Sequence, residues 1–98
     1  MVRKEYTKTG RSCRVTFSLP THSEAEKICL VGDFNEWNPS IHPMKRGKDG
    51  NYNVTISLKP GQAYDFRYLL DGKRWENDWE ADGIRSNTYG SENSVVMV

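Results

Sequence analysis

The segment YNVTISL, residues 52–58, alternates apolar and polar side chains without a break. Because successive side chains of a strand point to opposite faces, this period of two is typical of a strand with one buried face. Residues 13–19 and 64–70 repeat the pattern, and residues 28–31 and 95–98 are apolar throughout. The sequence therefore predicts three half-buried strands and two short, more deeply buried ones.

Turn-forming residues separate these strands. Lys59-Pro60-Gly61-Gln62 has the Pro-Gly order of a tight turn and predicts an antiparallel hairpin between the strands on either side. Asp71-Gly72 is typical of a short hairpin, with residues 74–76 returning as a short strand. Several short antiparallel strands with turns at this spacing indicate an all-β fold, a β-sandwich in which each sheet buries one face.

The alternating runs also identify the expected core. Eight inward-facing side chains should contribute to it: Cys13, Val15, Phe17, Val54, Ile56, Leu58, Phe66 and Tyr68. We expect the hydroxyl groups of Tyr64 and Tyr68 to reach the surface. With 98 residues the chain forms one domain with one small core. Residues 1–10 are polar and charged, and we expect a flexible segment there, followed by the sandwich domain over residues 11–98.

The charge balance excludes several classes of partner. Lys and Arg total 14 and Asp and Glu 13, whereas a nucleic-acid-binding protein needs a clearly basic face. No apolar run approaches the ~20 residues of a membrane span. The charged N-terminus is not followed by the apolar region of a secretion signal, so we expect a cytoplasmic protein with no nucleic-acid or membrane partner.

The metal-ligating and thiol residues are few. Cys13 and Cys29 lie in predicted strands, and we expect free, buried thiols, with a disulfide between neighbouring strands as the alternative. His22 and His42 lie in loop-like segments without companions at ligand spacing and are expected to be solvated. The sequence predicts neither a metal site nor a cofactor.

Catalytic residues are also not evident. Carboxylates are frequent over residues 65–82, but a glycosidase needs two of them facing each other across a cleft, for which a small sandwich has little room. We expect the acidic run over residues 76–82 to be solvated. The chain contains no local signature of a nucleophile with its base and no glycine-rich phosphate loop. We therefore expect a protein that is not an enzyme.

Three tryptophans lie outside the alternating runs, in polar surroundings. Trp37 ends the segment VGDFNEW, and Trp75 and Trp79 follow the Asp71-Gly72 turn. A flat ring flanked by Asn and Asp suits a sugar, which is apolar on its faces and hydroxylated at its edges. The alternative is that each ring packs over an end of the sandwich. Arg67 is either an ordinary solvated charge or a donor to sugar hydroxyls, and Asn93 either caps a turn or binds hydroxyls.

The order of these motifs resembles carbohydrate-binding module family 48. The resemblance rests on residues 30–37, Pro60-Gly61, residues 64–72, the following Trp75, and Asn93 before an apolar end strand, and it covers about residues 12–98. This family is the glycogen- and starch-binding domain of the AMP-activated kinase β subunit, and it precedes the barrel of isoamylases and branching enzymes.

The resemblance implies a fold and a set of site residues. The fold is an immunoglobulin-like, early-set β-sandwich. The two stacking tryptophans fall on Trp37 and Trp75, and Arg67 takes the place of a basic residue that binds sugar hydroxyls. Tyr89, Ser91 and Asn93 stand where kinase-type modules have Leu, Thr and Asn. Tyr in place of Leu changes the shape of that contact, and the turn before Trp75 is one residue longer than in the kinase pattern.

Together these observations predict a non-catalytic module that binds α-1,4-glucan, such as glycogen or starch, by tryptophan stacking. The alternative is a protein-docking or regulatory domain of the same fold, associated with a glycoside hydrolase family 13 enzyme or a kinase. A third possibility is a fragment of a glucan-active enzyme whose catalytic barrel is not included.

Overall fold

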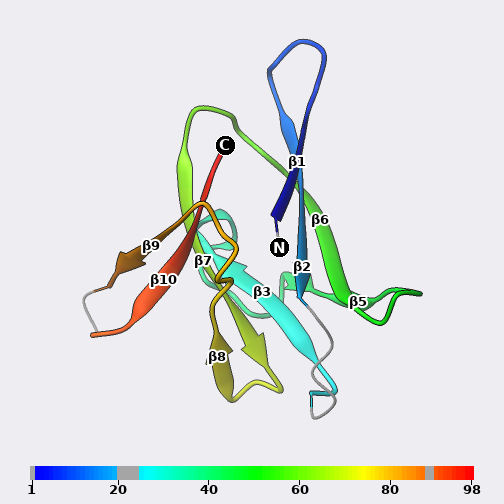
Figure 1. Cartoon of the computed structure of the whole chain (residues 1–98), viewed down its shortest axis with the longest axis vertical. Helices are drawn as coiled ribbons and strands as arrows, with labels where there is room; N and C mark the ends of the chain where they lie inside the picture. The colour runs from blue at the N-terminus through cyan, green and yellow to red at the C-terminus, as the bar shows by residue number, and fades with distance from the viewer. Residues whose placement is uncertain (1, 20–24, 88–89) are drawn as a thin grey trace.

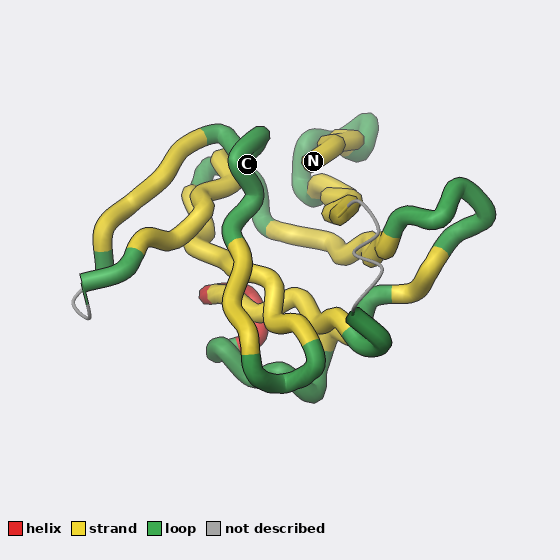
Figure 2. Tube along the Cα trace, turned by 60° about the horizontal axis from the view of Figure 1, so that its bottom comes forward, coloured by secondary structure: helices red, strands yellow, loops and turns green. Residues whose placement is uncertain are grey.

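The computed structural model describes residues 2–19, 25–87 and 90–98. Strands dominate the described residues: β1 (Val2–Tyr6), β2 (Cys13–Leu19), β3 (Ile28–Gly32), β4 (His42–Pro43), β5 (Lys45–Arg46), β6 (Tyr52–Leu58), β7 (Ala63–Leu70), β8 (Arg74–Glu76), β9 (Gly83–Ser86) and β10 (Glu92–Met97). The short 3-10 helix η1 (Asp33–Asn35) is the only helix in the described part of the chain (Figure 2).

The strands form two antiparallel sheets that face each other across the core. Sheet A has the order β1-β2-β6-β5, and sheet B has the order β4-β3-β7-β10-β9, with β8 also paired to β7. Figure 1 shows sheet A on the right and sheet B in the centre and on the left. The predicted all-β, immunoglobulin-like sandwich is confirmed. No helix in the described ranges is long and apolar enough to span a membrane.

The hairpin predicted at residues 59–62 is wrong. β6 pairs with β2 and β5 in sheet A, whereas β7 pairs with β3 and β10 in sheet B. The connection crosses from one sheet to the other in the upper half of the view in Figure 1, and Gly61 takes the left-handed conformation there, with φ of 84°. Alternation shows which face of a strand is buried but not which strand lies beside it, so the prediction of pairing failed. The return of residues 74–76 as β8 is confirmed by its pairing with β7.

Aromatic side chains at the inward positions form the centre of the core. The ring centroids of Phe17 and Phe66 are 4.9 Å apart, and those of Phe66 and Tyr68 are 5.7 Å apart. Of the eight predicted core residues six are buried, whereas Val54 and Ile56 of β6 are half-buried at the margin of the core. Both thiols are buried and free, as predicted.

The hydroxyl of Tyr68 does not reach the surface. It is buried and donates a hydrogen bond of 2.9 Å to Oδ2 of Asp78, which is itself buried although the sequence predicts a solvated acidic run. Burial, then the charge of Asp78 and this hydrogen bond, raises the pKa of Tyr68. Tyr64 does reach the surface, and its hydroxyl donates to the carbonyl of Lys59.

Residues 2–6 form a strand that the sequence does not predict. β1 pairs with β2 along its whole length, from Val2 opposite Phe17 to Tyr6 opposite Cys13. Its pairing uses backbone groups, which the polar composition of the segment does not reveal. The flexibility of residues 1–10 and a domain start at residue 11 stay predictions.

Candidate functional site

The outer face of sheet B carries apolar side chains where polar ones are usual. In β7, Leu69 points away from the core, since its neighbours Tyr68 and Leu70 point into it. The strand register places Cys29 beside Leu69 and Val31 beside Arg67. Cys29, Val31 and Leu69 form a second buried cluster, and Trp37 packs on it.

The turn after β3 brings Trp37 over this cluster. Glu36 and Trp37 both adopt the left-handed conformation, with φ of 55° and 58°, and the N–H of Trp37 donates to the carbonyl of Gly32. Asp33 then fixes the indole ring: its Oδ1 accepts from Nε1 of Trp37 at 2.9 Å, and its Oδ2 accepts from the backbone N–H of Asp65 at 2.8 Å. Trp37 is therefore half-buried, with one side on the sheet and its polar edge held.

Hydrogen bonds of Asn35 and His42 hold the same turn in place. Asn35 is buried, accepts from the N–H of Gly32, and donates to the carbonyl of Leu30. The same amide nitrogen lies 2.9 Å from Nδ1 of His42. Because the amide nitrogen of Asn35 can only donate, Nδ1 of His42 must accept. The ring proton of His42 is therefore on Nε2. The prediction of a solvated His42 is therefore wrong, and His22 lies outside the described residues.

This arrangement predicts a pH dependence of stability. Burial lowers the pKa of His42 in the folded protein, so the unfolded chain binds a proton more readily as the pH falls. The contribution of His42 to the free energy of unfolding is therefore complete above a pH of about 6.5 and is lost as the pH falls below it. Urea denaturation at pH 7.5 and at pH 5.5 measures the loss.

The control is His42→Gln, which keeps an acceptor beside Asn35 but does not titrate. We expect the wild type to lose more stability than this variant over the same pH interval. Equal losses would mean that other groups, which titrate in both proteins, account for the whole pH dependence.

Arg67 and Trp75 lie where β7 changes its neighbour. On one edge β7 pairs with β3, and on the other it pairs first with β10 over residues 63–66 and then with β8 over residues 68–70. Arg67 lies at this junction, with its Cζ 5.4 Å from the ring centroid of Trp75, within the range of a cation–π contact. Nε of Arg67 is buried and has no hydrogen-bond partner. Trp75 is 44% exposed.

The opposite side of the site comes from the end of β9 and the start of β10. Nδ2 of Asn87 donates to Oδ1 of Asn93 at 3.2 Å, and the N–H of Ser91 donates to Oδ1 of Asn87 at 3.1 Å. Asn93 in turn donates to Oδ2 of Asp65 at 3.3 Å and is buried within β10. Asn93 therefore links two strands and orients Asn87, rather than capping a turn.

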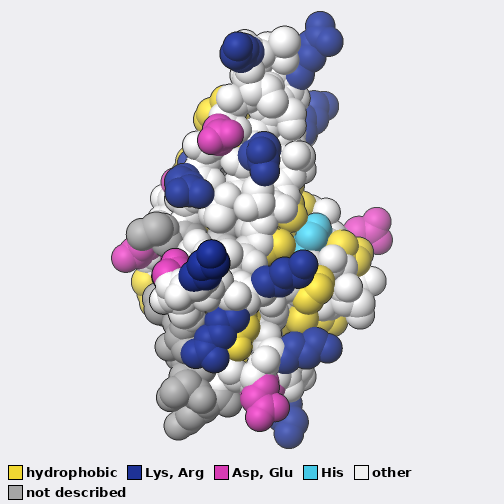
Figure 3. Space-filling view, turned by 90° about the vertical axis from the view of Figure 1, so that its right-hand side faces the viewer, with side chains coloured by type: hydrophobic (Ala, Val, Ile, Leu, Met, Phe, Trp, Pro, Cys, Tyr) yellow, Lys and Arg dark blue, Asp and Glu magenta, His cyan; other side chains and the backbone are white. Residues whose placement is uncertain are grey.

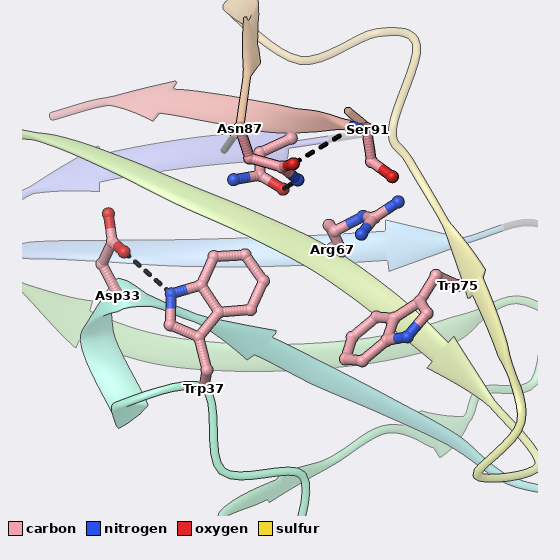
Figure 4. Close-up of a pocket in the computed structure, with 7 residues that line it drawn as sticks. Asp33, Trp37, Arg67, Trp75, Asn87 and Ser91 are labelled. Atoms are coloured by element: carbon pink, nitrogen blue, oxygen red, sulfur yellow. Dashed lines mark hydrogen bonds between the residues drawn. The ribbon is translucent and has the colours of Figure 1, made fainter. Parts of the chain in front are cut away.

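These side chains surround one hollow of about 690 Å³ on the outer face of sheet B. Its lining consists of Asp33, Trp37, Arg67, Trp75, Asn87, Ser91 and Asn93. In Figure 4 the two indole rings lie along one side, Asn87 and Ser91 lie on the other, and Arg67 lies between them. The structure thus brings together five of the six residues that the sequence singles out, and the sixth, Tyr89, lies outside the described residues.

Two lining residues were not among those selected from the sequence. Asp33 lies four residues before Trp37, and this spacing, which places its carboxylate at the indole N–H, was the available signal. Asn87 gave no signal beyond its polarity, because its role depends on the pairing of β9 with β10. Trp79 is 74% exposed and does not line the hollow. In the described ranges no cluster of His, Cys, Asp and Glu could hold a metal ion.

Comparison with known proteins finds relatives among 1,4-alpha-glucan branching enzymes and an amylopullulanase. A 1,4-alpha-glucan branching enzyme GlgB of Nitrosococcus oceani is 47% identical over 45 residues, which cover 44% of this chain and 6% of that enzyme. The corresponding enzyme of Photobacterium profundum is 35% identical over 75 residues, covering 74% and 10%. An amylopullulanase of Thermoanaerobacter thermohydrosulfuricus is 24% identical over 83 residues, covering 81% and 5%. The matched part of the chain thus spans a tenth or less of each of these relatives.

A family model describes the chain itself. The model of carbohydrate-binding module 48, the isoamylase N-terminal domain, matches residues 9–84, more than three quarters of the 98 residues. Trp37, Arg67 and Trp75 lie within the matched segment, and the residues on the opposite side of the hollow follow it. The chain therefore belongs to carbohydrate-binding module family 48, a family of binding modules.

Proposed function

We propose that this domain binds an α-1,4-linked glucan, such as glycogen or starch, in the hollow on sheet B and does not cleave it. The observation that carries the proposal is the placement of two indole rings and the Arg67 side chain around one hollow. The sugar rings would stack on Trp37 and Trp75, and polar groups on the other side would bind hydroxyls. Ser91 remains a predicted polar contact, and Tyr89, which stands where kinase-type modules have Leu, remains a predicted sugar contact.

The tryptophans differ in how they would meet the ligand. Trp37 is fixed by the apolar cluster and by Asp33, so one side of its ring is kept in place for a sugar at no further ordering cost. Trp75 is more exposed and rests against Arg67. Stacking of nucleic acid bases on aromatic rings contributes ~1–3 kcal/mol per ring, and similar sugar stacking on two rings corresponds to binding of roughly micromolar to millimolar strength.

The guanidinium group of Arg67 supports a polar ligand in the same hollow. Arg67 lines the hollow, and its planar group carries several N–H donors. A sugar hydroxyl can accept from one of these donors while its own proton is donated elsewhere. The apolar rings and this donor together match the two faces of a pyranose better than they match a purely apolar partner.

The carboxylates favour binding without hydrolysis. Glycoside hydrolases use two carboxylates on opposite sides of the scissile bond. Among the described lining residues only Asp33 carries one, and both of its oxygens already accept hydrogen bonds, from Trp37 and from Asp65. The relatives are named for action on 1,4-alpha-glucan, which supports the same ligand class for this domain. A glucan-active enzyme or a kinase attached to it or assembled with it would perform the chemistry.

Titration with maltoheptaose, followed by tryptophan fluorescence, tests the proposal. We expect saturable binding in the micromolar to millimolar range that changes little with salt, because a neutral sugar makes no ion pairs. Cellohexaose, a flat β-linked chain, is the control and should bind far more weakly. No response to maltoheptaose at millimolar concentration would leave the docking-domain alternative as the better interpretation.

A further inference from the structure

The charges of the domain are divided between its two sheets. Residues 2–19 and 44–62, which form sheet A and its turns, carry nine Lys or Arg and two Asp or Glu. The other half consists of the described residues 25–43, 63–87 and 90–98. It carries five Lys or Arg and ten Asp or Glu. The near-neutral chain therefore has a basic half and an acidic half, and the glucan site described above lies on the acidic one.

The outer face of sheet A is basic and polar. The strand register assigns to it Arg3 and Glu5 of β1, Arg14, Thr16 and Ser18 of β2, Lys45 of β5, and Asn53, Thr55 and Ser57 of β6. Within the described ranges only Lys4 among the nine cations of this half makes an ion pair, to Asp82 at 2.7 Å. Figure 3 views the molecule from the β6 side and shows Lys and Arg side chains from top to bottom.

A small hollow of about 150 Å³ lies on this face, lined by Arg3, Glu5, Arg14, Thr16 and Thr55. Arg3 and Arg14 are exposed and belong to neighbouring strands, with Thr16 directly opposite Arg3. The hydroxyls of Thr16 and Thr55 lie 2.9 Å apart. Two guanidinium groups and the one hydroxyl proton that the Thr16–Thr55 hydrogen bond leaves free can donate to a phosphate group, whereas Glu5 opposes its binding.

We propose that the outer face of sheet A binds phosphate monoesters carried by an α-glucan, with Arg3 and Arg14 as the main contacts. This inference rests on the proposed glucan binding and adds a class of substrate to it, a phosphorylated polysaccharide. A phosphate monoester carries a charge of about −1.5 to −2 at neutral pH, which complements the unpaired cations of this face.

The composition of the face favours a hydrated polymer over a protein. The buried centre of a protein interface is apolar and rich in aromatic residues. None of the nine side chains that the register assigns to this face is apolar or aromatic. The same lack of aromatic residues removes the platforms on which single-stranded nucleic acid stacks its bases.

The two sites lie on opposite faces of the sandwich. A single short chain does not reach both, but a branched polymer with many chains can occupy both at once. Binding at the second face is then intramolecular, and the affinity for the polymer exceeds that of the tryptophan site alone.

The test compares two preparations of one polymer, phosphorylated amylopectin and the same amylopectin after treatment with phosphatase. We expect the wild-type domain to bind the phosphorylated polymer about tenfold more tightly at low salt, an advantage that salt removes because the contacts are exposed charges. Arg3→Gln with Arg14→Gln should abolish the advantage and leave binding to the dephosphorylated polymer unchanged. Glu5→Gln should increase it.

The matched control is Lys27→Gln with Lys73→Gln, which removes two exposed cations from the other half of the domain. This variant should keep the advantage, and circular dichroism verifies that each variant is folded. Equal binding of both polymers by the wild type, or equal losses in the two double variants, would overturn the inference while the proposed glucan binding stands. Binding to neither polymer would overturn both, and tighter binding to duplex DNA than to the phosphorylated polymer would overturn the assignment to a glucan.

Discussion

Replacement of Gly32 by alanine is expected to lower the free energy of unfolding by about 3 kcal/mol or more, the upper end of the effect of overpacking. A Cβ atom at this position would lie 2.5 Å from the carbonyl oxygen of Asp65 and 2.9 Å from both Cζ of Phe34 and Cβ of Phe66. Gly32 has φ of −173°, an extended conformation that any residue adopts, so the requirement for glycine is one of space alone. Because the closest atom belongs to the backbone of the central strand β7, a side-chain rotation does not relieve the contact.

Gly83→Ala is the matched control for Gly32→Ala. A Cβ at Gly83 would meet only Cβ of Val95, at 3.9 Å, which is ordinary van der Waals contact. Urea denaturation should therefore show a large loss for the first variant and a change within about 0.5 kcal/mol for the second. A loss of stability for Gly32→Ala as small as that for Gly83→Ala would show that sheet B shifts to accept a methyl group at Gly32.

The second large effect is expected from replacing each of the two tryptophans by alanine. Both variants should weaken binding, but only one of them should also lose much stability. Trp75→Ala should weaken binding of maltoheptaose by roughly 1–3 kcal/mol, by analogy with base stacking, and should cost little stability because the ring is exposed. Trp37→Ala should weaken binding to a similar degree and also lower the free energy of unfolding by about 2–3 kcal/mol. The extra loss arises because Asp33 loses its indole donor and the cluster of Cys29, Val31 and Leu69 is uncovered.

Trp79→Ala provides the control, since Trp79 is exposed and lies outside the lining of the hollow. It should change neither binding nor stability. Calorimetric titration with maltoheptaose and urea denaturation of all three variants give the two readouts independently. If Trp75→Ala binds as tightly as the wild type, the hollow is not the glucan site, even if the domain binds glucan elsewhere.

Alternation in the sequence was sufficient to predict strands β2, β6 and β7 and their buried faces, but not their partners. The inward residues of β2, β6 and β7 follow directly from the period of two. Pairing depends on contacts between segments far apart in the chain, and Pro60-Gly61 suits a crossing between sheets as well as a hairpin. β1 was missed for a related reason, because a polar edge strand is held by backbone hydrogen bonds that leave no pattern in the side chains.

The aromatic half of the site could be predicted and the polar half only in part. Trp37 and Trp75 stood out because large rings in polar turns are unusual. Leu69 was a further signal that was not used, since it is apolar at an outward position of its strand. Asn93 was selected, but its bonds to Asp65 and Asn87 depend on the pairing of β10 with β7 and β9. The burial of Asp78 beneath Tyr68 likewise follows from tertiary packing that an acidic run does not reveal.

Along one edge of β7 the paired strand changes from β10 to β8. This change has a consequence for how ligand choice could change in such a domain. The position of Trp75 is set by its register opposite Leu69 in the hairpin of β7 and β8. A slip of one residue in this hairpin would turn the ring to the other face of the sheet, and a slip of two would move it about 7 Å along β7 while keeping it on the same face. The distance between the two rings can therefore change only in steps of about 7 Å, and the register of this hairpin sets the spacing of the two proposed stacking rings.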